Sequence, residues 1–365
     1  MDYTSEIRAR LALMIAAGGS PSALRRILRS FPTALEAKTA LSLPARIRQG
    51  LQSESIEDKV DQQLESAASI EAKWVLPQSI STMKGREQWA LLCVRGHLSS
   101  EPAVAVVGAR QTDEYGRLMA MSLGSALASG GISVVSGAAS GVDEVAHRAA
   151  LNVHGHTVAV LGTGLLGERN RARLALHEAI LAGGGALVSE YLVDAKGARW
   201  TFPERNHVIA RWGCAVVVVQ ARRKSGALIT AQAALETTVP VFAIPGDACH
   251  PLSEGTNTLI AQGNAHLLQH VGDLSEVTGV SDLRSAPWPS NGRFDTGVAS
   301  TPMGTTGLNE RTKVLRVIAQ QPGMDLESLD TRVGSLNRSL AEILLDLELD
   351  NQVKRRPDDT YEVRQ

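Results

Sequence analysis

Apolar residues recur at helical spacing through the first 64 positions of the chain. The clearest of them are Leu11, Leu13, Met14, Leu24, Ile27 and Leu28. Between the two groups, Gly18 and Gly19 end one helix, Ser20 can cap the next, and Pro21 suits a first helical turn. This pattern predicts an N-terminal helical domain over residues 1–70. A SAM-like or helix-hairpin-helix-like module and a plain helical bundle remain alternatives.

After residue 100 the pattern changes to short, continuous apolar runs rich in valine. The runs are Val104–Val107, Ile132–Val135, Thr157–Leu161, Ala186–Val188, Ala215–Val219 and Val241–Ile244. Helical stretches lie between most of them, at Leu118–Ala128, Val142–Leu151, Leu174–Leu181 and Ala227–Thr237. Fully apolar strands that alternate with helices indicate a mostly parallel sheet covered on both faces. We therefore predict a doubly wound, Rossmann-like α/β domain over residues 71–284.

The C-terminal part separates into a linker and a small domain. Residues 285–307 are rich in Ser, Pro, Gly and Thr without periodicity, which is typical of a flexible linker. In residues 308–365, the spacing of Leu340, Ile343, Leu344 and Leu347 predicts a third helix, and a turn at Pro357 predicts a hairpin after it. These elements favour a winged-helix-like domain. The third helix is acidic, so we expect it to contact protein rather than DNA.

Composition limits the classes of function. The formal net charge is −1 and aromatic residues make up only 4% of the chain, so a nucleic-acid binder of this kind must concentrate its positive charge locally. The three cysteines, Cys93, Cys214 and Cys249, lack disulfide or metal-ligand spacing, which predicts no metal site and suits a reducing cytoplasm. We find no signal peptide and no apolar run long enough for a bilayer, so we expect a cytoplasmic protein without a membrane partner.

Glycine-rich turns follow four of the predicted strands. Their candidate binding residues are Gly108, Arg110, Ser136, Gly137, Gly141, Gly162, Gly164, Ser225, Gly226 and Thr230. Glycines at such turns allow close approach to the backbone, and helix N-termini there favour anions. Because the carboxyl ends of parallel strands meet at one edge, the four turns together predict a binding site for an anionic ligand.

The stretch from Lys196 to Lys224 indicates what kind of anion binds. It holds seven basic residues and one acid, Glu204, with Trp200 and Phe202 interleaved. Positive charge follows a phosphate backbone, and aromatic faces stack on unpaired bases. The stretch therefore predicts single-stranded nucleic acid as the ligand. The alternative is a solvated surface loop with Trp200 packed in the core.

The ordered motifs along the core resemble those of the DprA/Smf family of DNA-processing proteins. The matching segments are Val107–Arg110, Ser136–Gly137, Gly141–Asp143, Val160–Gly162, Ser189–Tyr191, Phe202–Asn206, Ser225–Ala231, Pro245–Gly246 and Ser253–Asn257. Even Leu91–Gly96 resembles the strand that leads into the family's core. The resemblance covers nearly the whole chain.

The resemblance implies a role as well as a fold. Members of the family bind and protect single-stranded DNA and help load the RecA recombinase onto it during natural transformation. They form homodimers through the Rossmann-like core and use no known cofactor or catalytic step, so we expect no enzyme activity. By this resemblance the residues that contact the strand are Arg110, Lys196, Arg199, Phe202, Arg205 and Asn206, with Phe202 stacking a base.

The chain departs from the family pattern near the expected site. His207 and Arg211 stand where the family favours Arg and Gly, and Leu166, Arg169 and Asn170 replace an Asp and a Tyr-Pro pair. We expect an altered pocket wall there, with extra phosphate contacts from a basic helix start.

Two other functions remain open from the sequence. One is a nucleotide-processing enzyme related to phosphoribohydrolases, and the other is a nucleotide-sensing module. Against both, no GxGxxG opens the first strand–helix unit, the GGxGTxxE spacing is absent, and no poised acid pairs with a nucleophile.

Overall fold

The computed structural model describes residues 3–80 and 90–286 and then parts of the C-terminal segment. The later described residues are 288, 314–315, 317–318, 323–333, 340–349, 353–356 and 360–363. The chain divides into two compact units, Met1–Asp295 and Thr296–Gln365. Nearly all of the predicted linker lies outside the described residues, and the predicted domain boundaries stay predictions.

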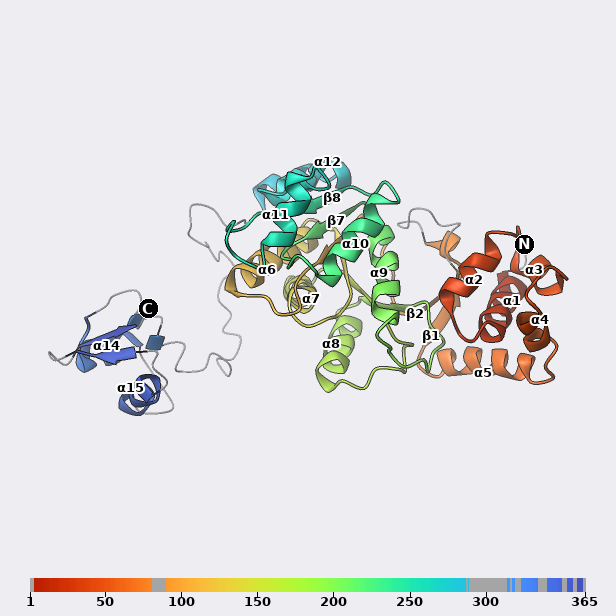
Figure 1. Cartoon of the computed structure of the whole chain (residues 1–365), viewed down its shortest axis with the longest axis horizontal. Coiled ribbons are helices and arrows are strands. Elements are labelled where there is room, and N and C mark those ends of the chain that lie inside the picture. The colour runs from red at the N-terminus through yellow and green to blue at the C-terminus, as the bar shows by residue number, and fades with distance from the viewer. Residues whose placement is uncertain are drawn as a thin grey trace. The chain divides into compact units, whose positions relative to one another are not determined.

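A nine-stranded sheet forms the centre of the first unit, and its strand order is β1-β2-β6-β5-β4-β3-β7-β8-β9 (Figure 1). The strands are β1 (Ala72–Val75), β2 (Leu92–Gly96), β3 (Ala103–Val107), β4 (Ser133–Ser136), β5 (Thr157–Val160), β6 (Ala186–Ser189), β7 (Ala215–Val218), β8 (Val241–Ala243) and β9 (His266–Leu267). The seven strands β3 to β9 pair with one another in parallel. Strand β2 joins β6 antiparallel, and β1 joins β2 antiparallel at the edge. All six predicted strands are present, and the predicted mostly parallel sheet is confirmed.

Alternate residues of each strand pack against helices on opposite faces of the sheet. On β3, Val104 and Val106 pack with α6 (Glu114–Ser129) and α7 (Val142–Asn152). Ala105 and Val107 instead pack with α9 (Thr201–Trp212) and α10 (Gly226–Leu235). Further along the sheet, α8 (Arg171–Ala182) packs with β5 and β6, and α11 (Glu254–Ala261) contacts β8. Because both faces are covered, the strands from β3 to β8 are buried at every position and mostly apolar, as the sequence predicted.

Five helices form the N-terminal part of the first unit. They are α1 (Tyr3–Ala16), α2 (Pro21–Leu28), α3 (Ala34–Thr39), α4 (Ala45–Leu51) and α5 (Ile56–Ala68). The helical prediction for this region is confirmed, and Ser20 caps α2 by accepting a hydrogen bond from the backbone N–H of Ala23. The apolar face of α1 shares a hydrophobic core with Trp74 of β1 and Cys93 of β2. This shared core attaches the helices to the antiparallel edge of the sheet.

Short elements complete the two units. In the first unit they are η1 (Pro77–Ser79), η3 (Val271–Leu274), α12 (Ser275–Thr278) and η4 (Ser281–Ser285). The second unit holds α14 (Leu326–Val333), α15 (Leu340–Leu349) and an antiparallel hairpin of β10 (Val353–Arg355) and β11 (Tyr361–Val363). Leu329, Ile343 and Leu347 are buried in its small core. Helices followed by a hairpin agree with the predicted winged-helix-like pattern.

Two further observations bear on the expectations from composition. None of the helices in the described part of the chain has both the length and the apolarity needed to cross a bilayer. Within the same described ranges, no three His, Cys, Asp or Glu side chains gather in a way that could bind a metal ion.

A buried histidine joins α7 to the sheet. His147 is fully buried, and its Nδ1 lies 2.7 Å from the hydroxyl of Thr157, which donates its own proton to the carbonyl of Val134. The hydroxyl must therefore accept from His147, so Nδ1 carries a proton. Burial, with smaller effects of His177 and Arg205, lowers the pKa of His147 to about 3, so the imidazole is neutral near pH 7.

This histidine predicts acid sensitivity. The folded protein keeps His147 neutral down to about pH 3, whereas the unfolded chain takes up a proton near pH 6.5, so stability is lost as the pH falls through that window. The free energy of unfolding should fall by about 1.4 kcal/mol per pH unit from this residue alone. Denaturant unfolding from pH 6.5 to 4 should give a shallower slope for His147→Gln. Equal slopes would contradict the assignment.

Candidate functional site

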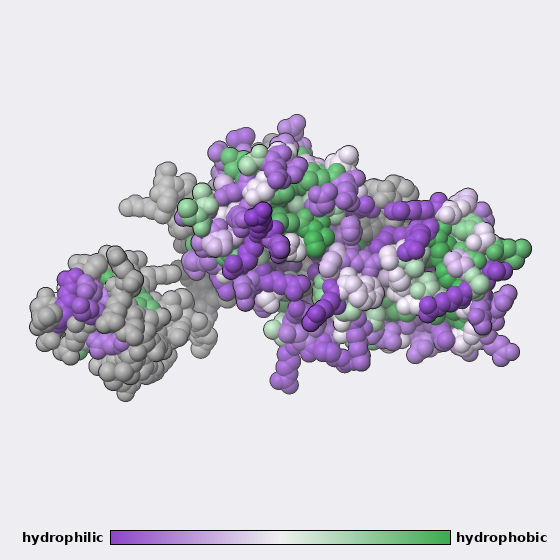
Figure 2. Space-filling view, viewed as in Figure 1, coloured by the Kyte–Doolittle hydropathy of each residue, from purple (hydrophilic) through white to green (hydrophobic). Residues whose placement is uncertain are grey.

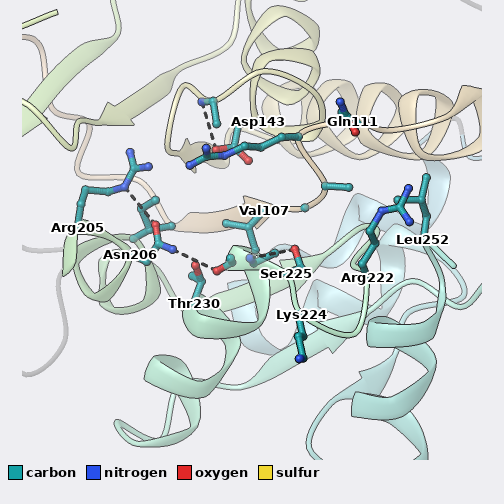
Figure 3. Close-up of a pocket in the computed structure, with 17 residues that line it drawn as sticks. Val107, Gln111, Asp143, Arg205, Asn206, Arg222, Lys224, Ser225, Thr230 and Leu252 are labelled. Atoms are coloured by element: carbon teal, nitrogen blue, oxygen red, sulfur yellow. Dashed lines mark hydrogen bonds between the residues drawn. The ribbon is translucent and has the colours of Figure 1, made fainter. Parts of the chain in front are cut away.

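The candidate site lies where the strand order of the sheet reverses. Strands β4 to β6 follow β3 on one side, and β7 to β9 lie on its other side. The turns after β3 and β7 therefore diverge and leave a crevice at the carboxyl edge, which is where open α/β sheets bind their ligands. A cavity of about 540 Å³ occupies this place. Figure 3 shows Arg205 and Asn206 on one side of Val107, and Arg222 and Lys224 on the other.

Three exposed cations line this switch-point cavity. Arg110 comes from the turn after β3, and Arg222 and Lys224 come from the loop between β7 and α10. Arg223, which lies between the latter two, points to a different partner and forms an ion pair with Glu254 at 3.8 Å. The carboxylate in the cavity wall, Asp143, is buried next to Arg205. The accessible charge of the cavity is thus positive.

Phe202 lines a smaller cavity that shares Arg110, Ala139 and Arg205 with the switch-point cavity. Its ring contacts the turn after β5, where a Cβ atom on Gly162 would lie only 2.7 Å from the ring. The guanidinium carbons of Arg110 and Arg173 lie 5.8 and 5.9 Å from the ring centre, which is cation–π range. Phe202 therefore sits between two positive groups, and Gly162 is needed to make room for it.

The turn after β4 already contains an anion that belongs to the chain itself. The carboxylate of Asp143 accepts hydrogen bonds from the backbone N–H groups of Gly137 at 3.1 Å and Ala139 at 3.4 Å. The hydroxyl of Ser136 is fully buried and donates to the carbonyl of Val106 at 2.6 Å. The N–H of Gly137 is therefore already used inside the protein. Contact of Ser136 or Gly137 with a ligand stays a prediction.

Arg205 is buried below the same turn, with only 4% of its surface exposed. Its guanidinium donates to the carbonyls of Gly137, at 2.8 Å, and of Val160. Burial lowers the pKa of Arg205 and raises that of Asp143, and the opposite charge of each partner counteracts the shift of the other. The two opposite charges therefore stabilise each other electrostatically inside the site, while their hydrogen bonds go to other groups. Direct contact of Arg205 with a ligand stays a prediction, since most of its donors already have partners.

Asn206 and Ser225 fix the position of α10 at the cavity. The amide of Asn206 donates to the carbonyl of Gly226 at 3.2 Å, and Ser225 caps α10 by accepting from the backbone N–H of Ala227. A Cβ atom on Gly226 would meet nothing within 4 Å, so this first turn is open to a ligand. Thr230 follows one turn later and is buried in the cavity wall.

Two of the predicted glycines have packing reasons for being glycine. Gly141 has a φ of +86°, and a Cβ atom there would lie 2.3 Å from the carbonyl oxygen of Ala109. A Cβ atom on Gly164 would lie 2.0 Å from the carbonyl oxygen of Leu192, and its N–H donates to Ala195. Gly141 thus lets the turns after β3 and β4 touch, while contact of Gly164 with a ligand stays a prediction.

The basic residues of the stretch from Lys196 to Lys224 lie on the loop before α9, on α9 itself and on the loop before α10. Lys196 and Arg199 are exposed on the loop before α9, whereas Phe202, Arg205 and Asn206 belong to α9 itself. Trp200 is 57% exposed and meets Tyr191 edge-on at 6.3 Å. The part of the alternative that packs Trp200 in the core is therefore wrong. Neither Lys196 nor Arg199 lines the switch-point cavity, and their contact with a ligand stays a prediction.

The predicted basic helix start is only partly available to a ligand. Asn170 caps α8 by accepting from the N–H groups of Ala172 and Arg173, and Arg173 pairs with Glu168 at 3.2 Å. Desolvation opposes ionisation of Glu168, but hydrogen bonds from the backbone of Asn170 and Arg169 and from Arg173 lower its pKa. Arg169 stays exposed, so the predicted extra phosphate contact remains a prediction for it.

A largely buried ion network, which no sequence motif indicated, ties α9 to the N-terminal helices. Arg25 of α2 donates to both carboxylate oxygens of Glu190 at 2.8 and 2.6 Å, and to Glu204 of α9 at 2.9 Å. Tyr191 donates to Glu204 at 3.3 Å and to the carbonyl of Thr201 at 2.8 Å. Burial raises the pKa of Glu190, and Arg25 counteracts this shift. The residues are far apart in sequence, so only the folded chain brings them together.

The fold and the site define a doubly wound α/β protein with a cationic cavity at its switch point. Residues 73–279 match the family described as DNA recombination-mediator protein A. Over 162 residues the chain is 45% identical to Protein Smf of Escherichia coli K12, and this match covers 44% of the chain and 43% of that protein. The match thus spans less than half of the E. coli protein.

Two solved structures are similar to the chain. DNA processing protein A of Streptococcus pneumoniae has a TM-score of 0.56 at 30% identity, over 67% of this chain and 84% of that one. DNA processing protein A of Helicobacter pylori, described for its single-stranded DNA binding mode, has a TM-score of 0.50 at 25% identity, over 57% and 96%. The chain belongs to the DNA recombination-mediator protein A family, the DprA/Smf family.

The network around Arg25 predicts a large loss of stability when the arginine is removed. Arg25→Ala leaves Glu190 and Glu204 without their cation, and breaking a buried pair from one side costs about 3 kcal/mol or more. Thermal unfolding of the full chain measures the loss. Arg26→Ala, one position further on exposed surface, is the matched control and should change stability by about 0.5 kcal/mol or less. Equal effects of the two substitutions would contradict the role of the network.

Proposed function

We propose that this protein binds single-stranded DNA at the carboxyl edge of its sheet. The observation that carries the proposal is the switch-point cavity, which three exposed cations line and where one of them, Arg110, lies 5.8 Å from the ring centre of Phe202. Phosphates need positive charge and unpaired bases need an aromatic face, and Arg110 brings the two together. The binding described for the H. pylori relative supports the same ligand class.

Each group in the site has a distinct part in the proposed binding. Arg110, Arg222 and Lys224 neutralise phosphates, and the open first turn of α10 lets the backbone of the strand approach closely. Phe202 presents a face to a base once Arg110 moves to a phosphate. Contacts of this kind read the backbone and stacked bases rather than base edges. We therefore expect little sequence preference and a preference for single strands, because a duplex hides its base faces.

The wider role follows from family membership and remains part of the proposal. We propose that the protein protects single strands and helps load the RecA recombinase during DNA uptake and recombination. We also propose a homodimer through the Rossmann-like core, action in the cytoplasm, and no catalytic step or cofactor. The absence of a buried acid or base paired with a nucleophile among the described residues of the cavity supports a binding protein rather than an enzyme.

A second candidate function is the binding of a free nucleotide. The volume of the cavity, about 540 Å³, is within the range of small-molecule sites and favours this alternative. Titration calorimetry with mononucleotides separates the two functions. Tight binding of a mononucleotide, without competition by an oligonucleotide, would favour the nucleotide-binding function over the proposed one.

Arg110 gives the sharpest mutational test. Arg110→Ala should weaken binding of single-stranded DNA by about tenfold or more, because a charge-assisted hydrogen bond is worth about 1.5–3 kcal/mol. Fluorescence anisotropy with labelled single- and double-stranded oligonucleotides measures the effect. Arg117→Ala is the control, since this arginine is also exposed but lies outside the cavity. Unchanged binding by Arg110→Ala would place the site elsewhere.

A further inference from the structure

Helix α2 presents an unusually basic surface beside the candidate site. It holds Arg25 and Arg26, its C-cap residue is Arg29, and none of its residues is acidic. Arg25 is used inside the protein, in the network with Glu190 and Glu204. Arg26 and Arg29 are exposed, and neither makes an ion pair with any other described residue. Two of the three charges on this helix therefore have no internal use.

The Arg25 network fixes this surface next to α9. Glu204, which receives the hydrogen bond from Arg25, directly precedes Arg205 of the cavity wall and lies two residues after Phe202. One side of α9 thus faces the cavities through Phe202 and Arg205, and the other faces α2 through Glu204. Figure 1 shows α9 on the side of the sheet toward the N-terminal helices. In Figure 2, hydrophilic side chains cover the junction between them.

Further groups on α9 extend the basic surface. His207 and Arg211 lie three and seven residues after Glu204, so helical spacing places them on the same side. Burial lowers the pKa of Arg211, and the positive charges of Arg25 and Arg29 lower it further, while Glu236 and Glu190 oppose them. The charge of Arg29 thus reaches α9. Exposed Trp200, at the start of α9, adds an aromatic face.

We infer that Arg26 and Arg29 of α2, together with Trp200, form a second contact for single-stranded DNA as the strand leaves the switch-point cavity. This inference rests on the proposed function of that cavity. It assigns the N-terminal helices a direct part in binding. It also explains why α2, which carries two exposed arginines without ion pairs, is held against α9 through Arg25. The surface combines cations with an exposed aromatic ring, which suits a flexible strand with unpaired bases.

The test compares short and long strands on the full-length protein. Labelled oligothymidylates of about 5 and about 25 nucleotides serve as probes, since single-strand sites cover about 4–16 nucleotides per domain. The double variant Arg26→Ala with Arg29→Ala should bind the long probe several-fold more weakly and leave the short probe unchanged. Two lost phosphate contacts should reduce the slope of log affinity against log salt concentration by about 1.4.

A charge-matched control comes from the same helical domain. Arg46 of α4 and Lys59 of α5 are both exposed, and Figure 1 shows α4 at the end of the domain away from α9. Arg46→Ala with Lys59→Ala removes the same charge and should leave both probes unaffected. If the control variant binds the long probe as weakly as Arg26→Ala with Arg29→Ala does, the loss of affinity comes from overall charge alone. That result would overturn the inference.

The remaining outcomes separate this inference from the function on which it rests. If Arg26→Ala with Arg29→Ala binds the long probe like the wild type while Arg110→Ala does not, the second contact is refuted and the proposed function stands. If the wild type binds neither probe, both fail. A separate Trp200→Ala variant should lower affinity for the long probe with an unchanged salt slope, because a stacking contact releases no counterions.

Discussion

The candidate site depends on two buried side chains of opposite charge, Arg205 and Asp143. The guanidinium of Arg205 reaches from α9 beneath the sheet edge and donates to the carbonyls of Gly137 and Val160, while Asp143 accepts from the turn after β4. Three elements that end at this edge are therefore held by two charged side chains that barely meet water. Removing either side chain would leave the other charge buried without its counter-charge, which destabilises the fold. The shape of the cavity follows from this constraint.

The polar groups at this edge of the sheet fall into two sets, one that holds the structure together and one that is exposed. Asp143, Arg205 and Asn206 have their hydrogen-bond partners inside the protein and hold the turns and α10 in place. Arg110, Arg222 and Lys224 are exposed and able to meet a ligand. Hydrogen-bonded inner groups and exposed outer cations suit a polyanion whose sequence varies, because phosphates recur at every nucleotide while bases differ. The N-terminal helices show the same combination. Arg25 is used inside the protein and holds α2 against α9, while Arg26 and Arg29 of the same helix region are exposed.

Much of the fold could be predicted from the sequence, and the reason is local. Continuous valine runs such as Ala215–Val218 can only be central strands, and the glycine turns mark where those strands end. The direction of each side chain at the edge could not be predicted in the same way. Arg205 and Arg110 look alike in sequence, yet one is buried and the other exposed, because residues distant in the chain decide their surroundings. The same holds for Arg25 and Glu190, which lie 165 residues apart, and for Trp200, whose exposure no periodicity reveals.

Mapping the contacts of a bound strand tests the central claim most directly. Photo-crosslinking of the full-length protein to an oligonucleotide with 5-iodouracil, followed by mass spectrometry, identifies the side chains that lie against bases. The account predicts crosslinks at Phe202 and in the turns after β3 and β7, with further crosslinks at Trp200 on longer strands. Crosslinks confined to the C-terminal unit, with none along the carboxyl edge of the sheet, would contradict it.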